Sequence, residues 1–198
     1  NEEEGVPGCI ANGISEEIAN KIYDEMTDFA KYAFNKSHAA AYAVVSYQTA
    51  YLKYYYPVEF MAALMTSVVE MPNKVAEYIS VCRQMGIQIL PPDINRGMYG
   101  FSVDKGAIRY ALSAIKSIGR PVIEGIVRER EEHGEYTSLK TFVERNINQI
   151  NKRVVENLIK AGALDCLEGN RKQKMFVYPQ IIDSINQDKK HSMEGQMS

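Results

Sequence analysis

The sequence has 198 residues, of which 45% are hydrophobic, and a formal net charge of −2 at pH 7. A chain of this size can bury a core as one or two domains, and it contains neither a secretory signal nor an apolar run long enough to cross a bilayer. Three widely spaced cysteines without metal-ligand spacing argue against disulfides or zinc and indicate free thiols in a reducing cytoplasm.

The acidic residues gather at the start of the chain. Residues 1–28 hold eight acids against Lys21 alone, which leaves about 22 basic and about 17 acidic residues in the remainder. This weak basic bias is compatible with DNA contact but does not predict it. The sequence opens on an acidic run and without Met, so we expect it to be a piece of a longer chain.

The first predicted helix follows the turn signal Asn12-Gly13. Ser15 is placed to cap it, and Glu16 and Glu17 fall in its first turn, where carboxylates suit the helix dipole. Its apolar residues recur at helical spacing, and we expect them to form a buried stripe. They are Ile18, Ile22, Met26 and Phe29.

A polar, basic pentad, Phe34–His38, precedes a helix-forming run that continues to Tyr56. Asn35 or Ser37 is expected as the N-cap. The start of such a helix gathers free backbone N–H groups, the positive end of the dipole, a lysine and a histidine. Together these predict a site for a phosphate or a carboxylate. The alternative is a core helix with an ordinary capped start and solvated lysines.

Two further helices and a small amount of β structure follow. Pro57 opens one helix, and Asn73 is expected to cap the next, which ends at Gly86. Residues 87–90 read as an extended edge piece, and residues 101–110 as a β-hairpin that turns at Asp104-Lys105-Gly106.

Residues 115–119 join two predicted helical stretches through a short turn, and the second stretch covers residues 121–132. This is the pattern of a helix-hairpin-helix, whose turn N–H groups bind nucleic-acid backbones while Lys and Arg add charge. Lys116 and Arg120 flank the turn. The usual motif has a glycine where this chain has Ser117, and serine resists positive φ, which weakens the predicted phosphate contact. A hairpin used only for packing is the alternative.

The remaining segments are also predicted to be helical. Thr137 or Ser138 caps a short helix, Asn151 caps one that ends near 161–163, and the last runs over residues 171–185 before a frayed tail. Basic residues of the second of these helices either reach a phosphate strand or form a solvated face; they are Lys152, Arg153 and Lys160.

Several stretches resemble a known family almost without gaps. They are Phe34–Tyr42, Ser46–Lys53, Tyr56–Leu64, Ile89–Asn95, Leu112–Gly119, Asn151–Arg153 and Ala161–Asp165. They resemble the fingers region of the alpha subunit of bacterial DNA polymerase III, the C-family replicative polymerase, over roughly residues 8–175. The resemblance implies a mainly α fold class: a helical fingers bundle with one small β-hairpin and a helix-hairpin-helix-like C-terminal part.

We expect three parts. Residues 1–72 hold the N-terminal fingers helices and the nucleotide-site motif, residues 73–166 the remaining fingers and the helix-hairpin-helix-like region, and residues 167–198 a C-terminal helix and frayed tail. The resemblance implies nucleotide-binding roles for Asn35, Lys36, Ser37, His38 and Tyr42. We assign DNA-binding roles to Lys53, Lys116, Ser117, Gly119, Arg120, Lys152 and Arg153.

The implied function is to position the incoming dNTP and the primer-template in a bacterial, cytoplasmic replicase, with the sliding clamp among its other subunits and no membrane partner. Nucleotidyl transfer needs metal ions held by clustered carboxylates, whereas Asp93, Asp104 and Asp165 stand isolated in predicted turns. In the family the metal-binding aspartates lie upstream in the palm. We therefore expect Mg²⁺ in the full-length polymerase, no metal, cofactor or catalytic residue in this segment, and no activity of the segment alone.

Two other interpretations stay open. A non-enzymatic helix-hairpin-helix module or adaptor would bind primer-template by itself, with an affinity that falls steeply as salt rises. A purely structural helical domain would bind nothing. A polymerase segment is expected to bind weakly or not at all in isolation.

Overall fold

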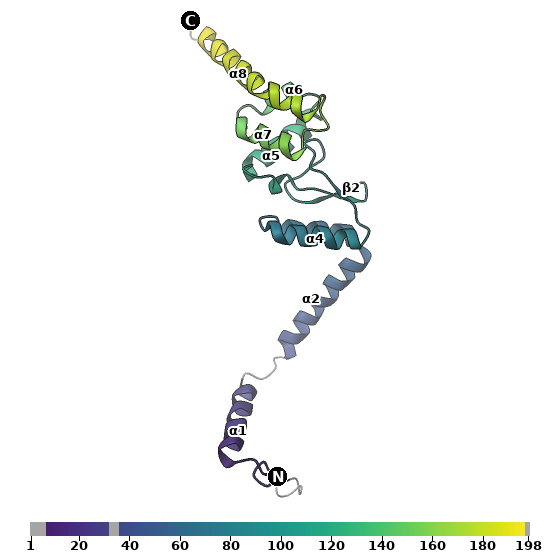
Figure 1. Cartoon of the computed structure of the whole chain (residues 1–198), viewed down its shortest axis with the longest axis vertical. Helices are drawn as coiled ribbons and strands as arrows, with labels where there is room; N and C mark the ends of the chain where they lie inside the picture. The colour runs from purple at the N-terminus through teal and green to yellow at the C-terminus, as the bar shows by residue number, and fades with distance from the viewer. Residues whose placement is uncertain (1–6, 32–35, 197–198) are drawn as a thin grey trace. The chain divides into compact units, whose positions relative to one another are not determined.

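The computed structural model describes residues 7–31 and 36–196, most of which are helical (Figure 1). The elements in chain order are α1 (Glu16–Lys31), α2 (Lys36–Tyr55), α3 (Pro57–Ser67), α4 (Pro72–Gln84), β1 (Ile89–Leu90), β2 (Ser102–Asp104), β3 (Ala107–Arg109), the 3₁₀ helix η2 (Leu112–Ala114), α5 (Arg120–His133), α6 (Leu139–Asn146), α7 (Lys152–Ala161) and α8 (Arg171–Gln196). The predicted fold class is confirmed: mainly α with a small sheet. No helix in the described ranges is both long and apolar enough to cross a membrane.

The chain divides into two compact units, Asn1–Tyr51 and Leu52–Ser198. The second unit has two hydrophobic cores, and both cross the boundaries expected between the three parts. Met65 and Cys82 belong to one core, and Leu158 and Ile182 to the other. The three-part division therefore stays a prediction about roles, not a description of packing. The three cysteines are free thiols, as predicted.

Helix α1 begins as predicted, because the backbone N–H of Ile18 donates to Ser15 Oγ at 3.4 Å. The prediction of a buried stripe on α1 was wrong. Ile22 is 39% exposed and Phe29 is 76% exposed. Among the described residues of the first unit, the turn at residues 8–10 comes close to this face, around an open hollow of about 340 Å³. An apolar helix face is buried only where another layer covers it.

Helix α2 begins at Lys36, so the prediction of Ser37 as N-cap was wrong: Ser37 lies within the first turn. The other expected cap, Asn35, lies outside the described residues, as does Phe34. No described residue of α2 is buried. The alternative of a core helix therefore does not describe α2 among the residues that the structure describes.

Helix α3 starts with Pro57 at its first position, as predicted, and buries Met61 and Met65. Helix α4 starts differently from the prediction. Pro72 occupies its first turn and Met71 is the N-cap residue, so Asn73 lies inside the helix and caps nothing. Proline favours the first helical position because its missing N–H has no intrahelical partner there.

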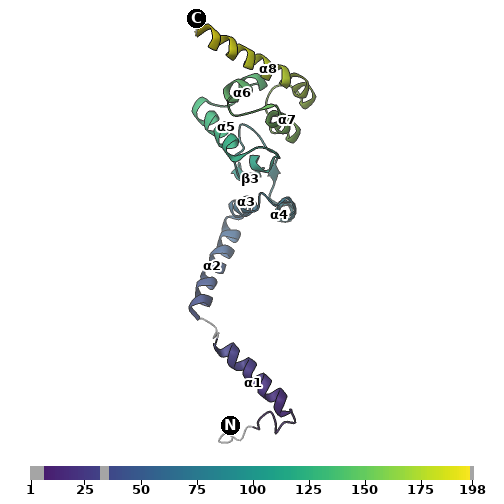
Figure 2. The ribbon, with the colours of Figure 1, turned by 90° about the vertical axis from the view of Figure 1, so that its left-hand side faces the viewer.

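The sheet contains the predicted hairpin and one more strand. Its order is β1-β3-β2, with β3 antiparallel to β2 and parallel to β1. Lys105 and Gly106 form the turn with φ of 53° and 79°, the pair of positive values that a two-residue hairpin favours. Thr66 of α3 accepts from the Phe101 N–H at 2.9 Å, which fastens the sheet to α3, beside β3 in Figure 2.

Helices α5 to α8, together with η2, surround the larger of the two cores, the one that contains Leu158 and Ile182. Ser138 caps α6 and Asn151 caps α7, as predicted, with side-chain oxygens that accept from backbone N–H groups at 3.1 and 3.0 Å. Figure 1 shows α8 beside α6 and α7. Helix α8 continues to Gln196, so the prediction that it ends near Ile185 was wrong. No Gly or Pro interrupts residues 186–194.

The start of α8 is held by two cations. Arg171 binds the carboxylate of Asp165, and this ion pair lowers the pKa of Asp165. Lys174 is only 2% exposed, and its Nζ donates to the carbonyls of Leu167 at 2.8 Å and Gly169 at 2.6 Å. A buried ammonium is tolerated when its donors are satisfied in this way.

Candidate nucleic-acid interface

The turn between η2 and α5 has an unusual backbone. Ser117 has φ of 64°, and Lys105 is the other non-glycine residue of the described chain with a positive φ. The sequence predicted that serine would resist this conformation, which costs about 1–2 kcal/mol for an L-residue. The turn nevertheless keeps the backbone that a glycine would give it. Such a residue persists when its surroundings hold it there.

The surroundings of the turn are buried on one side and open on the other. Ile115 and Ile118 are 7% and 8% exposed and anchor the turn in the larger core. Lys116 and Ser117 between them are exposed. From α7, the side-chain Nδ2 of Asn157 donates to the Lys116 carbonyl at 2.9 Å. The packing of Ile115 and Ile118 and the hydrogen bond from Asn157 thus hold the exposed part of the turn in place.

The open side of the turn presents hydrogen-bond donors. Among the described residues, the backbone N–H groups of Lys116, Ser117, Gly119 and Arg120 donate to no protein acceptor. Gly119 is the N-cap residue of α5, so two of these donors lie at the positive end of a 14-residue helix. A left-handed residue followed by a helix start forms a concave set of N–H groups that binds anions.

Arg120 flanks this turn as predicted. Its Nε donates to Glu124 at 2.7 Å, which raises the pKa of Arg120, and its guanidinium lies 4.7 Å from the ring centroid of Tyr99. The side chain remains 66% exposed. An exposed ion pair of this kind contributes little to stability, so Arg120 can exchange Glu124 for a phosphate at low cost.

A hollow of about 430 Å³ adjoins the turn. It is lined by residues that follow β1 and β3, by η2 and the turn, and by α7: Pro92, Tyr110, Ala114, Ile115, Lys116, Asn157, Lys160 and Ala161. Lys160 at its rim pairs with Glu156 at 2.5 Å and lowers the pKa of that carboxylate. The sequence did not single out Asn157 or Tyr110, because neither carries a charge or a motif.

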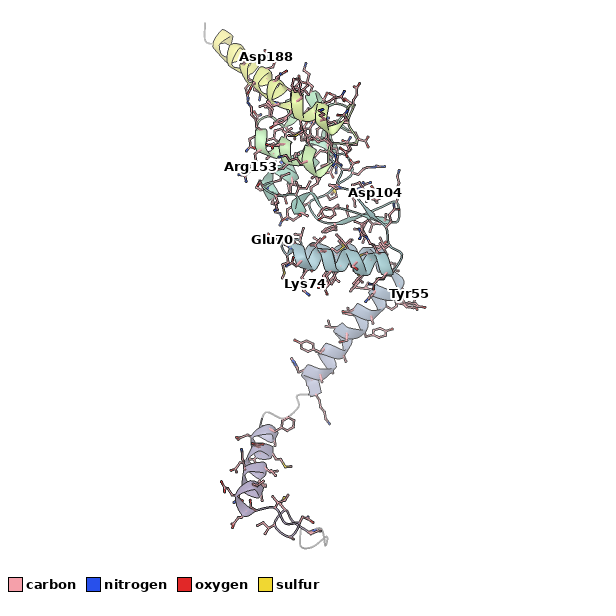
Figure 3. All side chains as sticks on the ribbon, viewed as in Figure 1. Tyr55, Glu70, Lys74, Asp104, Arg153 and Asp188 are labelled. Carbon is pink, nitrogen blue, oxygen red and sulfur yellow. The ribbon has the colours of Figure 1, made fainter. Side chains whose placement is uncertain are left out.

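The other predicted DNA-binding residues occupy two helices. Lys152 and Arg153 open α7 and are exposed, with Arg153 labelled in Figure 3. Lys152 pairs with Asp183 at 2.7 Å, whereas Arg153 has no carboxylate within 4.0 Å among the described residues. Lys53 lies in the last turn of α2 and is exposed.

The predicted nucleotide-binding residues lie at the start of α2. Lys36, Ser37, His38 and Tyr42 are exposed there, while Asn35 lies outside the described residues. Residues two positions apart on a helix do not face each other, so Lys36 and His38 point to different sides. His38 shares a side with Tyr42 instead, and their ring centroids are 4.5 Å apart.

The isolated acids have structural roles. Asp93 accepts from the N–H groups of Asn95 and Arg96 at 2.7 and 3.1 Å, and Asp104 pairs with Arg109. Across the described ranges, one group brings three possible metal ligands within 4.8 Å of one another: Glu129, Glu132 and His133. Glu129 already accepts from Arg145 at 3.0 Å and contacts His133 at 3.1 Å, so its charge is engaged within the protein.

The turn and the helices around it define a class of protein. The first of the two predicted helical stretches is only the three-residue 3₁₀ helix η2, while the second is α5. Residues 86–174, which include both, match the family model described as "Helix-hairpin-helix motif". The part of the chain that carries Lys116, Ser117 and Arg120 thus lies within the segment that resembles this motif.

Particular relatives resemble nearly the whole chain. This chain is 44% identical over 188 residues to "DNA polymerase III subunit alpha" of Chlamydia pneumoniae. The matched region covers 94% of this chain and 15% of that protein. The protein of the same name from Vibrio cholerae serotype O1 is 45% identical, and the match covers 96% of this chain and 16% of that protein. The one from Thermus aquaticus is 49% identical, and the match covers 82% of this chain and 13% of that protein. The resemblance stated from the sequence is confirmed: this chain matches a segment of the bacterial DNA polymerase III alpha subunit. It spans about 15% of the length of these relatives.

Proposed function

We propose that this chain is the fingers and helix-hairpin-helix segment of a bacterial replicative DNA polymerase. Its hairpin turn binds the DNA backbone, and the start of α2 holds the incoming nucleotide for nucleotidyl transfer at carboxylates elsewhere in the polymerase. The similarity to DNA polymerase III alpha subunits supports the class. The observation that carries the DNA contact is the exposed turn at Ser117, with free N–H groups beside Lys116.

The turn suits a phosphate of the DNA backbone. Its N–H groups can donate to phosphate oxygens, and the α5 dipole and Lys116 stabilise the negative charge. None of these groups reads a base edge, so the contact carries no sequence preference. A replicative polymerase must hold every sequence equally, and a contact of this kind meets that need.

At the start of α2, Lys36 supplies a positive charge for the polyphosphate of a dNTP, and Ser37 can donate a hydrogen bond to it. The pair of rings at His38 and Tyr42 offers a surface against which a base pair can pack. Mg²⁺ held elsewhere in the polymerase would stabilise the attacking and leaving oxygens. We propose primer-template DNA, dNTP and the sliding clamp of the bacterial cytoplasm as the partners of that polymerase.

The test compares two exposed lysines from turns that contain positive φ: Lys116, which precedes Ser117, and Lys105, which itself has φ of 53°. In a full-length alpha subunit that carries this segment, Lys116→Ala and Lys105→Ala are each titrated with primer-template duplex at several salt concentrations. Lys116→Ala should weaken binding several-fold and reduce the slope of log K against log salt by about 0.9, the value for one phosphate contact. Lys105→Ala should match the wild type. Unchanged affinity and slope in Lys116→Ala would overturn the proposed contact.

The same titration on the 198-residue chain alone addresses the adaptor interpretation. Tight duplex binding with a steep salt dependence would favour an independent DNA-binding module. Weak or absent binding would favour a segment that works within its polymerase.

A further inference from the structure

The hydrogen bond from Asn157 to the turn joins residues 41 positions apart in the sequence. It ends on the carbonyl of Lys116, the residue directly before the left-handed Ser117. The Lys116 carbonyl and the Ser117 N–H belong to the same peptide plane. In a trans peptide these two groups point in opposite directions. Because the carbonyl points at Asn157 on α7, the Ser117 N–H points away from α7.

We propose that Asn157 is a positioning residue for phosphate binding at the turn. Its side-chain amide fixes the plane of the Lys116–Ser117 peptide, which holds Ser117 in the left-handed region and keeps the N–H of Ser117 directed outward. Asn157 does not touch the phosphate in this role. The inference rests on the proposed binding of the DNA backbone by the turn, and it names the residue that makes this turn competent without its glycine.

Asn157 is itself held rigidly. Leu158 and Ile159, which follow it on α7, are each 1% exposed, and Val155 is fully buried. Asn151 caps the helix at one end, and Gly162, with φ of 82°, ends it at the other. A donor on a well-packed helix can constrain an exposed turn, whereas a donor on a mobile loop cannot. The turn needs such a constraint because its serine lacks the freedom of glycine.

The test is a double-mutant cycle between Asn157 and Ser117 in a full-length alpha subunit that carries this segment. Asn157→Ala should weaken primer-template binding on the order of threefold to tenfold, the range for loss of one hydrogen bond. Ser117→Gly should bind at least as tightly as the wild type, because glycine adopts positive φ without help. In the Ser117→Gly background, Asn157→Ala should then change the affinity by less than about twofold.

Two controls accompany the cycle. Asn73→Ala replaces an exposed helical asparagine of α4 and should leave DNA binding unchanged. Lys116→Ala reports on the proposed function separately, because it removes charge and leaves the Lys116 carbonyl in place. Thermal unfolding of every variant shows whether an effect on binding reflects a loss of folded protein.

The outcomes separate the two claims. Loss of affinity in Lys116→Ala, together with an Asn157→Ala defect that Ser117→Gly rescues, supports both. Loss in Lys116→Ala with no defect in Asn157→Ala, or with a defect of equal size in both Ser117 backgrounds, overturns the positioning role and leaves the proposed function standing. Unchanged affinity in Lys116→Ala overturns the proposed contact, and the role of Asn157 with it.

Discussion

Asn95 and Tyr136 exchange two hydrogen bonds across 41 positions of the sequence. Asn95 Nδ2 donates to the Tyr136 carbonyl at 2.9 Å, and the Tyr136 N–H donates to Asn95 Oδ1 at 2.8 Å. The side-chain amide thus pairs with the backbone of Tyr136 as a neighbouring strand would. It ties the segment after β1 to the segment before α6, and the Tyr136 side chain beside it is 2% exposed.

Asn95→Ala should therefore lower the free energy of unfolding by about 2–4 kcal/mol, because it removes two hydrogen bonds and leaves two backbone groups of Tyr136 without partners. Urea denaturation followed by circular dichroism measures this change. Asn73→Ala on exposed α4 is the matched control and should change stability by less than about 0.5 kcal/mol. Equal midpoints for the two variants would contradict the structural role of Asn95.

Asp104 and Arg109 form a shielded ion pair that should give stability a pH dependence. Their side chains are 14% and 13% exposed, and Arg109 holds the pKa of Asp104 below its usual value through a hydrogen bond. A lowered pKa stabilises the fold above the pKa of the unfolded carboxyl, near 3.9, and this stabilisation is lost as the pH falls through the lower folded value.

Asp104→Asn should accordingly destabilise the chain by about 1–3 kcal/mol at pH 7, and the gap to the wild type should close as the pH falls below about 4. Urea titrations at pH 7, 5 and 3 measure the gap. Asp183→Asn removes an exposed ion pair with Lys152 and should cost less than about 1 kcal/mol at pH 7. A gap that stays constant across this range would refute the assignment.

Gly97 occupies a position without room for a side chain. A Cβ placed there would lie 2.6 Å from the Asp93 carbonyl oxygen and 3.0 Å from Leu112 Cγ. The obstacle is backbone, which cannot move aside as a flexible side chain would. Gly97→Ala should therefore destabilise the chain by about 1–3 kcal/mol. Gly8→Ala, which meets open space, is the control for chemical denaturation. Similar unfolding curves for both variants would show that the close approach is absent.

Lys36→Ala tests the nucleotide role of the start of α2. In a full-length alpha subunit that carries this segment, it should raise the KM for dNTP or lower kcat, with kcat/KM reduced about tenfold for the loss of one charged contact. Lys21→Ala removes an exposed lysine from α1 and should leave kcat/KM as it is. Steady-state primer extension gives both parameters, and an unaltered kcat/KM in Lys36→Ala would rule out the assignment.

The sequence predicted features whose causes are local. Ser138 and Asn151 were identifiable as caps because an N-cap interacts within its own first turn. Asn73 was misassigned because Pro72, one residue earlier, opens the helix instead. The buried stripe on α1 failed for a different reason: periodicity gives an apolar face but cannot supply the layer that covers it.

The candidate site divides in the same way. The sequence predicted the turn and its flanking charges at Lys116 and Arg120, but it did not predict the conformation of Ser117. That conformation accompanies a hydrogen bond from Asn157 on another helix, and a contact between residues 41 positions apart leaves no pattern in the sequence. A local rule against serine at positive φ was therefore overridden by tertiary structure.

The enclosed ammonium of Lys174 bears on how strongly this chain attracts a polyanion. The run Arg171–Lys174 contains three basic residues, but Lys174 is buried and donates to two backbone carbonyls, whereas Arg171 forms an exposed ion pair with Asp165. Lys172 and the exposed Arg171 can therefore displace condensed ions from a duplex, whereas the buried Lys174 cannot. A count of basic residues would thus overstate how strongly DNA binding at this end of the chain depends on ionic strength, because part of this charge is already engaged within the fold.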